Sequence, residues 1–203
     1  GCGMQSAGYF EIDSIQSAHG RAAATAVGAK RMSPKNLIFT YQGDGAASAI
    51  GFLETFSAAN RGEPITAIMI NNQIYGMTGG QTSPTTLLGQ KTVTTYQGGR
   101  DAAREGYPVH MAEILGGLEA PGYVARVSLH TPKNILHAEK VIEKAFRLQI
   151  EESKYSFVEI LSTCPTNWGI HPRKAPEYVE KYVLPEFPLG EFKKSDEKGV
   201  KSC

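Results

Sequence analysis

The stretch LIFTYQGDG at residues 37–45 joins a short run of bulky apolar and aromatic side chains to a glycine-flanked aspartate. A run of this length and composition predicts a buried β-strand, and Gly43-Asp44-Gly45 predicts a tight turn at its carboxyl end. Apolar residues at helical spacing follow between Ile50 and Ala59, and Gly62 and Pro64 mark the end of that segment. Strand, tight turn and helix in this order are the building unit of parallel α/β sheets.

The same alternation continues along the chain. A second apolar run at residues 65–70 ends in Asn71-Asn72, and residues 73–100 carry many Gly, Thr and Gln residues without an apolar period, which predicts a long ordered loop. Further strands are expected at residues 123–129 and 157–161, and helices at residues 20–31, 109–119 and from Thr131-Pro132 to about residue 149. We therefore expect an α/β fold with a doubly wound, mostly parallel sheet and helices on both faces.

Length and composition limit the classes of protein to which the chain can belong. Its 203 residues, 41% of them hydrophobic, suffice for one sizeable core. The 21 Lys and Arg residues nearly balance the 20 Asp and Glu residues, so no global electrostatic attraction to nucleic acid or to an anionic membrane is expected. No apolar run approaches the roughly 20 residues that a membrane-spanning helix needs, and no signal-peptide pattern opens the chain.

Cysteine usage indicates the compartment. Cys2, Cys164 and Cys203 lie far apart and are odd in number, which argues against the disulfide framework of a secreted protein and favours the cytoplasm. The chain opens on Gly1-Cys2-Gly3 without a methionine. This opening resembles the interior of a domain, so further residues are expected upstream.

Two polar side chains follow neighbouring strands at the point where each strand ends. Asp44 follows the first strand and Asn72 the second, and a right-handed crossover brings both to one edge of the sheet. Mg2+ prefers hard oxygen ligands and keeps only one or two protein carboxylates. Asp44, the Asn72 amide and the Ile74 carbonyl fit that preference, and the glycines beside Asp44 allow the backbone to approach a phosphate closely. A diphosphate bridged by Mg2+ is the expected ligand.

Gly-Asp-Gly followed after 25 residues by Asn-Asn resembles the motif of thiamine-diphosphate enzymes. The next stretch, YGMTGGQTSPTT at residues 75–86, resembles the beta subunits of 2-oxoacid:ferredoxin oxidoreductases. His19-Gly20-Arg21 and CPTNW at residues 164–168 resemble the same family. The resemblance runs from Gly1 to about Lys193 and is greater to the 2-oxoglutarate and branched-chain 2-oxoacid branches than to the pyruvate branch.

The resemblance implies a thiamine-diphosphate-binding fold and a site. It implies a cofactor-binding domain at residues 1–165. The prolines and charges beyond Trp168 predict an extended tail at residues 166–203, which wraps a neighbour or frays and is mobile from Lys193 to Lys201. The resemblance also implies a role for His19 at the substrate or the thiazolium, and a clamp whose donors come from residues 78–81. The residues implied to bind the cofactor are Gly43, Asp44, Gly45, Asn72, Ile74, Gly76, Met77, Thr78 and Gly79, with Mg2+ on Asp44, Asn72 and Ile74.

An iron–sulfur cluster is the third implied cofactor. In the resembling family four cysteines of this subunit bind a [4Fe-4S] cluster, and Cys2 and Cys164 stand where two of them are expected. The upstream CxxC pair is absent, and Cys203 in a charged tail is a poor substitute. Truncation of the chain, loss of the cluster and departure from the family all remain open.

The implied activity is oxidative decarboxylation of a 2-oxoacid, of the 2-oxoglutarate or 2-oxoisovalerate type, to acyl-coenzyme A and CO2, with electrons passing to ferredoxin. The implied assembly is a hetero-oligomer with a pyrimidine-binding alpha subunit and further gamma or delta subunits. That partner supplies the glutamate that activates the cofactor, so we interpret Glu54 as a helix-face or interface residue. Lys91 and Arg100 are candidates for a substrate carboxylate and equally for solvated charges.

Two other functions remain open. One is a subunit of a redox-free thiamine-diphosphate decarboxylase or synthase, which would need Asp44 and Asn72 but no cluster. The other is a non-catalytic nucleotide-binding module, because a doubly wound fold alone does not determine function.

Overall fold

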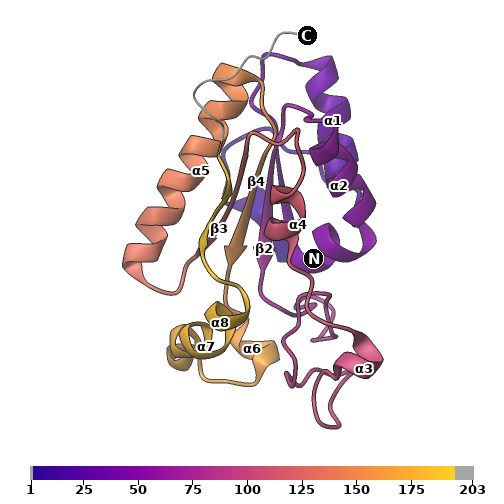
Figure 1. Ribbon diagram of the computed structural model, residues 1–203, viewed down its shortest axis with the longest axis vertical. Helices are drawn as coiled ribbons and strands as arrows, with labels where there is room; N and C mark the ends of the chain where they lie inside the picture. Colours follow the sequence, from indigo (N-terminus) through magenta and orange to yellow (C-terminus); the bar gives the residue numbers. More distant parts are fainter. Residues whose placement is uncertain (1, 195–203) are drawn as a thin grey trace.

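The protein, described here for residues 2–194 by a computed structural model, is built on a five-stranded sheet (Figure 1). The strand order is β1-β2-β4-β3-β5. The first four strands in this order are parallel, and the last is antiparallel to β3. The strands are β1 (Phe39–Gly43), β2 (Thr66–Asn71), β3 (Tyr123–Ser128), β4 (Ser156–Leu161) and β5 (Gly190–Lys193). The prediction of a mostly parallel sheet is confirmed.

Helices cover both faces of this sheet, as a doubly wound fold requires (Figure 1). The long helix α5 (Pro132–Glu152) packs on one face, where Ile68, Val127 and Ile160 meet its buried side. On the other face lie α1 (Ala22–Met32), α2 (Phe52–Asn60) and α4 (Met111–Gly116), which enclose the larger core cluster. The remaining segments before the tail are η1 (Cys2–Gly8), η2 (Ala46–Ile50) and α3 (Ala102–Glu105).

The sequence signals that predicted α5 have direct structural counterparts. The Thr131 side chain accepts a hydrogen bond from the Asn134 N–H, and Pro132 occupies the first turn. Gln149, buried near the other end, exchanges two hydrogen bonds of 2.8 Å with the main chain of Ile38. Helix α5 is therefore attached to the start of β1 by polar as well as apolar contacts.

The expected extended tail from residue 166 is wrong for the residues that the structure describes. The chain there forms α6 (Pro165–Trp168), η3 (Pro172–Lys174), α7 (Ala175–Tyr178), η4 (Val179–Val183), α8 (Leu184–Glu186) and then β5. Ala175, Val179, Val183 and Phe187 recur every four residues and are all buried, the last three against Leu87 and Leu161. Prolines and charges between them hide this apolar stripe in the sequence. Residues 195–203, with Cys203 and the expected mobile end, lie outside the described part.

The carboxyl ends of the parallel strands face one end of the molecule, where the loop with α3 and the segments α6, α7 and α8 also lie (Figure 1). Between residues 73 and 100 the chain forms no helix or strand, apart from an isolated bridge between Tyr75 and Gln81. The predicted long loop is confirmed, and it covers the edge at which ligands bind in open α/β sheets. None of the described helices is long and apolar enough to cross a membrane.

Candidate functional site

Asp44 and Asn72 lie at the same edge of the sheet, each just after the end of its strand. Strands β1 and β2 are parallel neighbours, and Gly43 at the end of β1 is in register with Ile70 near the end of β2. Both strands stop there, because the glycine turn follows one and an Asn-Asn pair ends the other. The predicted meeting of these two strand ends is confirmed.

The Asp44 carboxylate is buried and surrounded by donors. Its Oδ1 accepts the Gly45 N–H at 2.8 Å, and its Oδ2 accepts the hydroxyls of Ser83 and Thr85, each at 2.8 Å. Burial raises the pKa of Asp44 to about 6, although these bonds and one from the Ile74 N–H favour its charged form. A buried carboxylate with a raised pKa lacks a full counter-charge, and a cation beside it would relieve that deficit.

The Asn72–Ile74 turn meets the same carboxylate. The Ile74 N–H donates to Asn72 Oδ1 at 3.4 Å, and it lies near enough to Asp44 to favour the charged form of that carboxylate and so to lower its pKa. The Asn72 carbonyl accepts the indole Nε1–H of Trp168 at 3.0 Å, and this hydrogen bond helps to fix the position of Asn72. Asp44, Asn72 and Ile74 therefore lie close together at this edge, and their role as Mg2+ ligands stays a prediction.

The chemistry of these groups fits a magnesium ion. A carboxylate, an amide oxygen and a main-chain carbonyl are all hard oxygen ligands, and Mg2+ completes its octahedron with water and phosphate oxygens. Within residues 2–194 no group of three His, Cys, Asp or Glu side chains is arranged to bind a metal, so the structure offers no competing all-side-chain site.

The glycine-rich stretch after Ile74 forms a closed loop beside Asp44. The Tyr75 N–H donates to the Gln81 carbonyl at 3.0 Å, and Gly79 and Gly80 adopt left-handed φ values of 104° and 97°. The Tyr75 ring lies on Gly45, where a Cβ would stand 1.9 Å from a ring carbon. Glycine at position 45 is therefore required for this close approach.

A comparison with protein families identifies the kind of domain that carries this site. The model of the thiamine pyrophosphate enzymes, C-terminal TPP binding domain, matches residues 3–160. The chain belongs to this family. The match covers Asp44, the Asn72–Ile74 turn and the glycine-rich loop, so the thiamine-diphosphate fold predicted from the motifs is confirmed.

Individual relatives narrow the family to 2-oxoacid:ferredoxin oxidoreductase subunits, as the motifs predicted. The chain is 44% identical over 193 residues to the ketoisovalerate oxidoreductase subunit VorA of Methanothermobacter marburgensis, covering 95% of this chain and 40% of that protein. It is 31% identical over 211 residues to the 2-oxoglutarate synthase subunit KorB of Methanocaldococcus jannaschii, covering 95% of this chain and 73% of that protein. The chain thus spans well under half the length of VorA.

A solved structure shares the fold of this thiamine-diphosphate domain. It is the 2-oxoglutarate:ferredoxin oxidoreductase from Magnetococcus marinus with 2-oxoglutarate, coenzyme A and succinyl-CoA bound, at 24% identity and a TM-score of 0.66. The match covers 90% of this chain and 65% of that one.

In the predicted clamp at residues 78–81, two of the polar side-chain groups hydrogen bond within the clamp itself. The Thr78 hydroxyl donates to Gln81 Oε1 at 2.5 Å, and Gln81 Nε2 donates to the Thr78 carbonyl at 2.9 Å. Gly76 is half-buried, while Met77, Thr78 and Gly79 are exposed, and Asn167 Nδ2 holds the Gly76 carbonyl at 3.2 Å. The loop therefore has a fixed shape, and its binding role stays a prediction.

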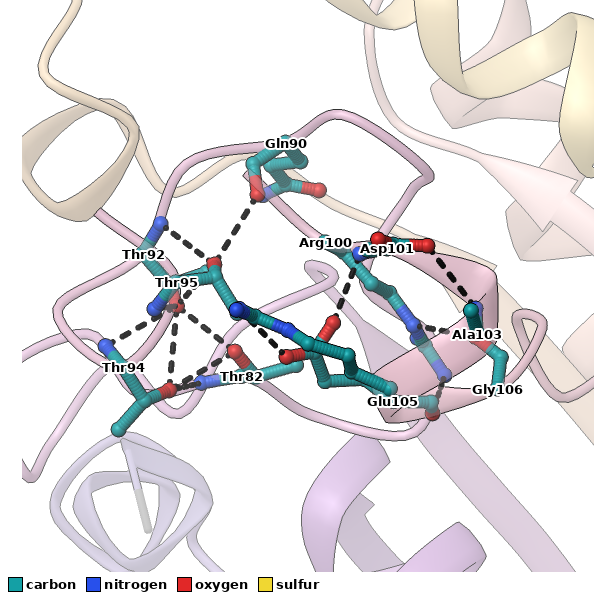
Figure 2. A network of polar contacts seen from close by, with 11 residues as sticks. Thr82, Gln90, Thr92, Thr94, Thr95, Arg100, Asp101, Ala103, Glu105 and Gly106 are labelled. Atoms are coloured by element: carbon teal, nitrogen blue, oxygen red, sulfur yellow. Dashed lines mark hydrogen bonds and ion pairs between the residues drawn. The ribbon is translucent and has the colours of Figure 1, made fainter. Parts of the chain in front are cut away.

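The second half of the long loop is held by threonine hydroxyls and by Arg100 (Figure 2). Thr92 Oγ1 lies 2.7 Å from Thr82 Oγ1 and 2.8 Å from Thr95 Oγ1. The guanidinium of Arg100 donates to six main-chain carbonyls, those of Ser83, Pro84, Thr86, Glu105, Gly106 and Tyr107. The idea that Arg100 meets a substrate carboxylate is therefore wrong in this structure, because its donors are already used. Lys91 is exposed, which agrees with a solvated charge.

The residues that follow His19 contact the end of the segment after Asp44, at Ile50 and Gly51. Gly20 touches the main chain of Gly51, where a Cβ on Gly51 would stand 2.3 Å from the Gly20 carbonyl oxygen. Arg21 pairs with Glu54, which confirms Glu54 as a helix-face residue. His19 is largely exposed, and the partial desolvation of its ring lowers its pKa. Its catalytic role stays a prediction.

The cysteines do not provide a complete cluster site. Cys164 is a half-buried free thiol whose Sγ accepts Asn167 Nδ2 at 3.2 Å, and the Cys2 side chain lies outside the described part. A four-thiolate cluster needs one cysteine more than the three in this sequence. The cluster does not fit the residues of this chain alone, so no electron-transfer step is derived through it.

Several residues that shape the site were not identified from the sequence. Ser83 and Thr85 bond Asp44 from about 40 positions away, and Asn167 and Trp168 brace the turn and the loop from the CPTNW segment. The sequence indicated these four residues only indirectly, because they lie in the stretches at residues 75–86 and 164–168 that resemble the family. Spacing carries no information on such long-range contacts.

Proposed function

We propose that this chain is the diphosphate- and magnesium-binding part of a 2-oxoacid:ferredoxin oxidoreductase. The observation that carries the proposal is the convergence of the Asp44 carboxylate and the Asn72–Ile74 turn at one edge of the sheet, in a domain of the thiamine pyrophosphate enzyme family. The predicted Mg2+ ligands are Asp44, the Asn72 side chain and the Ile74 carbonyl. Gly45 and the loop at residues 76–79 are predicted to lie against the diphosphate.

The work of the chain's own residues is binding and orientation. When bound, thiamine diphosphate supplies the carbanion chemistry that cleaves the bond beside a 2-oxo group. Asp44 and Asn72 would fix the metal and so the diphosphate end of the cofactor. Ser83, Thr85 and Trp168 hold those two residues in place, so the site needs little rearrangement when the ligand arrives.

The proposed substrate is a branched-chain 2-oxoacid of the 2-oxoisovalerate type. The support is the 44% identity to a subunit named ketoisovalerate oxidoreductase, against 31–36% to subunits named 2-oxoglutarate synthase. Coenzyme A as acyl acceptor is supported by the ligands of the structurally similar enzyme. Ferredoxin as electron acceptor and a cytoplasmic location stay predictions from the sequence.

The proposal includes an active site shared with a pyrimidine-binding subunit. The family model that matches the chain is that of the C-terminal TPP binding domain, and a complete thiamine-diphosphate site also needs a place for the pyrimidine end of the cofactor. The matching protein VorA is more than twice as long as the aligned region, so the pyrimidine-binding part can lie on a longer chain or on a separate subunit.

The test is 2-oxoacid-dependent reduction of a viologen dye by the full protein with its partner subunits, with thiamine diphosphate, Mg2+ and coenzyme A present. We expect faster reduction with 2-oxoisovalerate than with 2-oxoglutarate, no reduction by the chain alone, and loss of reduction in Asp44→Asn. Release of CO2 and the corresponding aldehyde without dye reduction would contradict the redox function. Iron analysis of the same sample separates this proposal from a redox-free decarboxylase or synthase, which needs no cluster.

A further inference from the structure

We propose that Glu159 is a positioning residue for the metal-binding turn and acts through the side-chain amide of Asn71. This inference rests on the proposed function, since the turn it positions is Asn72–Ile74. Glu159 lies on β4 and is fully buried, and neither the family motifs nor the spacing of polar residues points to it.

The contacts form a chain that runs from the sheet to the turn. Glu159 Oε2 accepts Arg126 Nε at 2.9 Å, and Glu159 Oε1 accepts Asn71 Nδ2 at 2.6 Å. Asn71 Oδ1 in turn accepts the Gln73 N–H at 3.2 Å and Gln73 Nε2 at 3.0 Å. Glu159, Asn71 and Gln73 are all buried, so water does not compete for these bonds.

The carboxylate determines which way the Asn71 amide points. Burial raises the pKa of Glu159, while its ion pair with Arg126 favours the charged form. Both oxygens of the charged carboxylate can only accept, so the NH2 end of the amide must face Glu159 and its oxygen must face Gln73. The opposite orientation would place oxygen against oxygen at one end and N–H against N–H at the other. The amide therefore has one satisfied orientation in this site.

That orientation stabilises an uncommon backbone conformation at Gln73. Its φ is 58°, in the left-handed region that side chains other than glycine rarely adopt. Asn71 Oδ1 receives the Gln73 N–H, and the Gln73 carbonyl receives the Thr86 hydroxyl at 2.6 Å. The left-handed residue redirects the chain between Asn72 and Ile74, which places the Ile74 N–H against Asp44.

A buried ion pair is a costly way to stabilise a core, because apolar residues of similar size are often as stable. The pair of Arg126 and Glu159 is fully buried, and Arg126 also pairs with Glu113 and lies over the rings of Phe187 and Phe192. What this pair adds beyond core stability is the direction that Glu159 imposes on the Asn71 amide.

Glu113 offers a matched control. It pairs with the same guanidinium through two hydrogen bonds, one of them at 2.8 Å, but it lies on α4 and makes no contact with Asn71. Glu113→Gln and Glu159→Gln each remove one carboxylate charge beside Arg126. In both variants an amide with one acceptor oxygen would face two donors, but only in Glu159→Gln is one of those donors Asn71 Nδ2, which can then lose its acceptor.

The experiment measures the Mg2+ concentration that half-saturates thiamine-diphosphate binding, by calorimetry on the full protein with its partner subunits, together with the thermal midpoint. We expect Glu159→Gln to raise that Mg2+ concentration about tenfold or more, in line with one unmade buried hydrogen bond. Glu113→Gln should lower the thermal midpoint and leave the Mg2+ dependence unchanged. Asn71→Ala should match Glu159→Gln, and the double variant should be no worse than Asn71→Ala alone.

The outcomes separate this inference from the proposed function. A wild-type protein that binds thiamine diphosphate without any Mg2+ dependence overturns the proposed function and this inference together. A wild-type protein that depends on Mg2+, with Glu159→Gln unchanged, overturns the inference alone. If Glu159→Gln does not fold, Asn71→Ala still decides, because an unchanged Mg2+ dependence in that variant means that Glu159 does not act through this amide.

Discussion

Replacing Arg100 should destabilise the long loop far more than its position in an irregular segment suggests. The side chain is 5% exposed and donates six hydrogen bonds, and the acceptor carbonyls of Ser83 and Thr86 belong to fully buried contacts. A hydrogen bond from a charged group contributes about 1.5–3 kcal/mol. Losing the two fully buried bonds alone therefore costs about 3–6 kcal/mol in Arg100→Met.

Arg100→Lys tests the geometry separately from the charge. An ammonium has three N–H donors on one atom, so it can replace at most half of the six bonds and cannot reach both sides of the planar guanidinium. We expect this variant to lie between the wild type and Arg100→Met. Because Ser83 and Thr85 carry the hydroxyls that hold Asp44, both variants should also weaken Mg2+-dependent binding of thiamine diphosphate.

The assay is thermal and denaturant unfolding, with Arg104→Met as the control. Arg104 lies in the same loop region, but its side chain is 60% exposed and pairs only at the surface with Glu105, so its loss should cost less than about 0.5 kcal/mol. In a domain of this size about 1 kcal/mol corresponds to about 2–4 °C, so Arg100→Met should lower the midpoint by about 6 °C or more. Equal midpoints for Arg100→Met and Arg104→Met would refute the reasoning.

Two further substitutions, the first with a control on α1, and one change of pH test the surroundings of Asp44 and Asn72. Gly51→Ala forces a Cβ against the Gly20 carbonyl and should cost about 1–3 kcal/mol in unfolding experiments, whereas Gly28→Ala, in open space on α1, should stabilise by about 0.5–1 kcal/mol. Trp168→Phe removes the hydrogen bond to Asn72 and should weaken Mg2+-dependent cofactor binding about fivefold by calorimetry, with little change in stability. Because the pKa of Asp44 is raised to about 6 by burial, the metal-free fold should lose about 3 kcal/mol of stability as pH rises from about 4 to about 6, a loss absent in Asp44→Asn.

The fold was predictable because its signals are local. The parallel strands are short runs of mostly apolar residues, and α5 carries its own cap at Thr131-Pro132. The meeting of Asp44 and Asn72 was also predictable, since two consecutive parallel strands joined by a helix must present their carboxyl ends at one edge.

The residues that hydrogen bond to Asp44 and Asn72 were not predictable by the same reasoning. Ser83 and Thr85 reach Asp44 from a loop without periodicity, and Trp168 reaches Asn72 across 96 positions. Such contacts depend on the path of an irregular chain, which no propensity determines. The prediction for the segment after residue 168 was wrong for a different reason. Its prolines suggest an extended chain, whereas its apolar residues recur at helical spacing.

The two buried arginines, Arg100 and Arg126, approach the predicted metal site from different sides. Arg100 fixes the loop whose hydroxyls hold Asp44, and Arg126 fixes Glu159, which orients the amide beside Asn72. Neither cation contacts the predicted metal ligands, so neither competes with Mg2+ for them. Asp44 and Asn72 are thus held in place by two separate sets of contacts, and a ligand that binds both residues would link the two sets. Binding of the metal and the diphosphate should therefore stabilise the loop and the sheet edge together, by an amount that grows with ligand concentration over its dissociation constant.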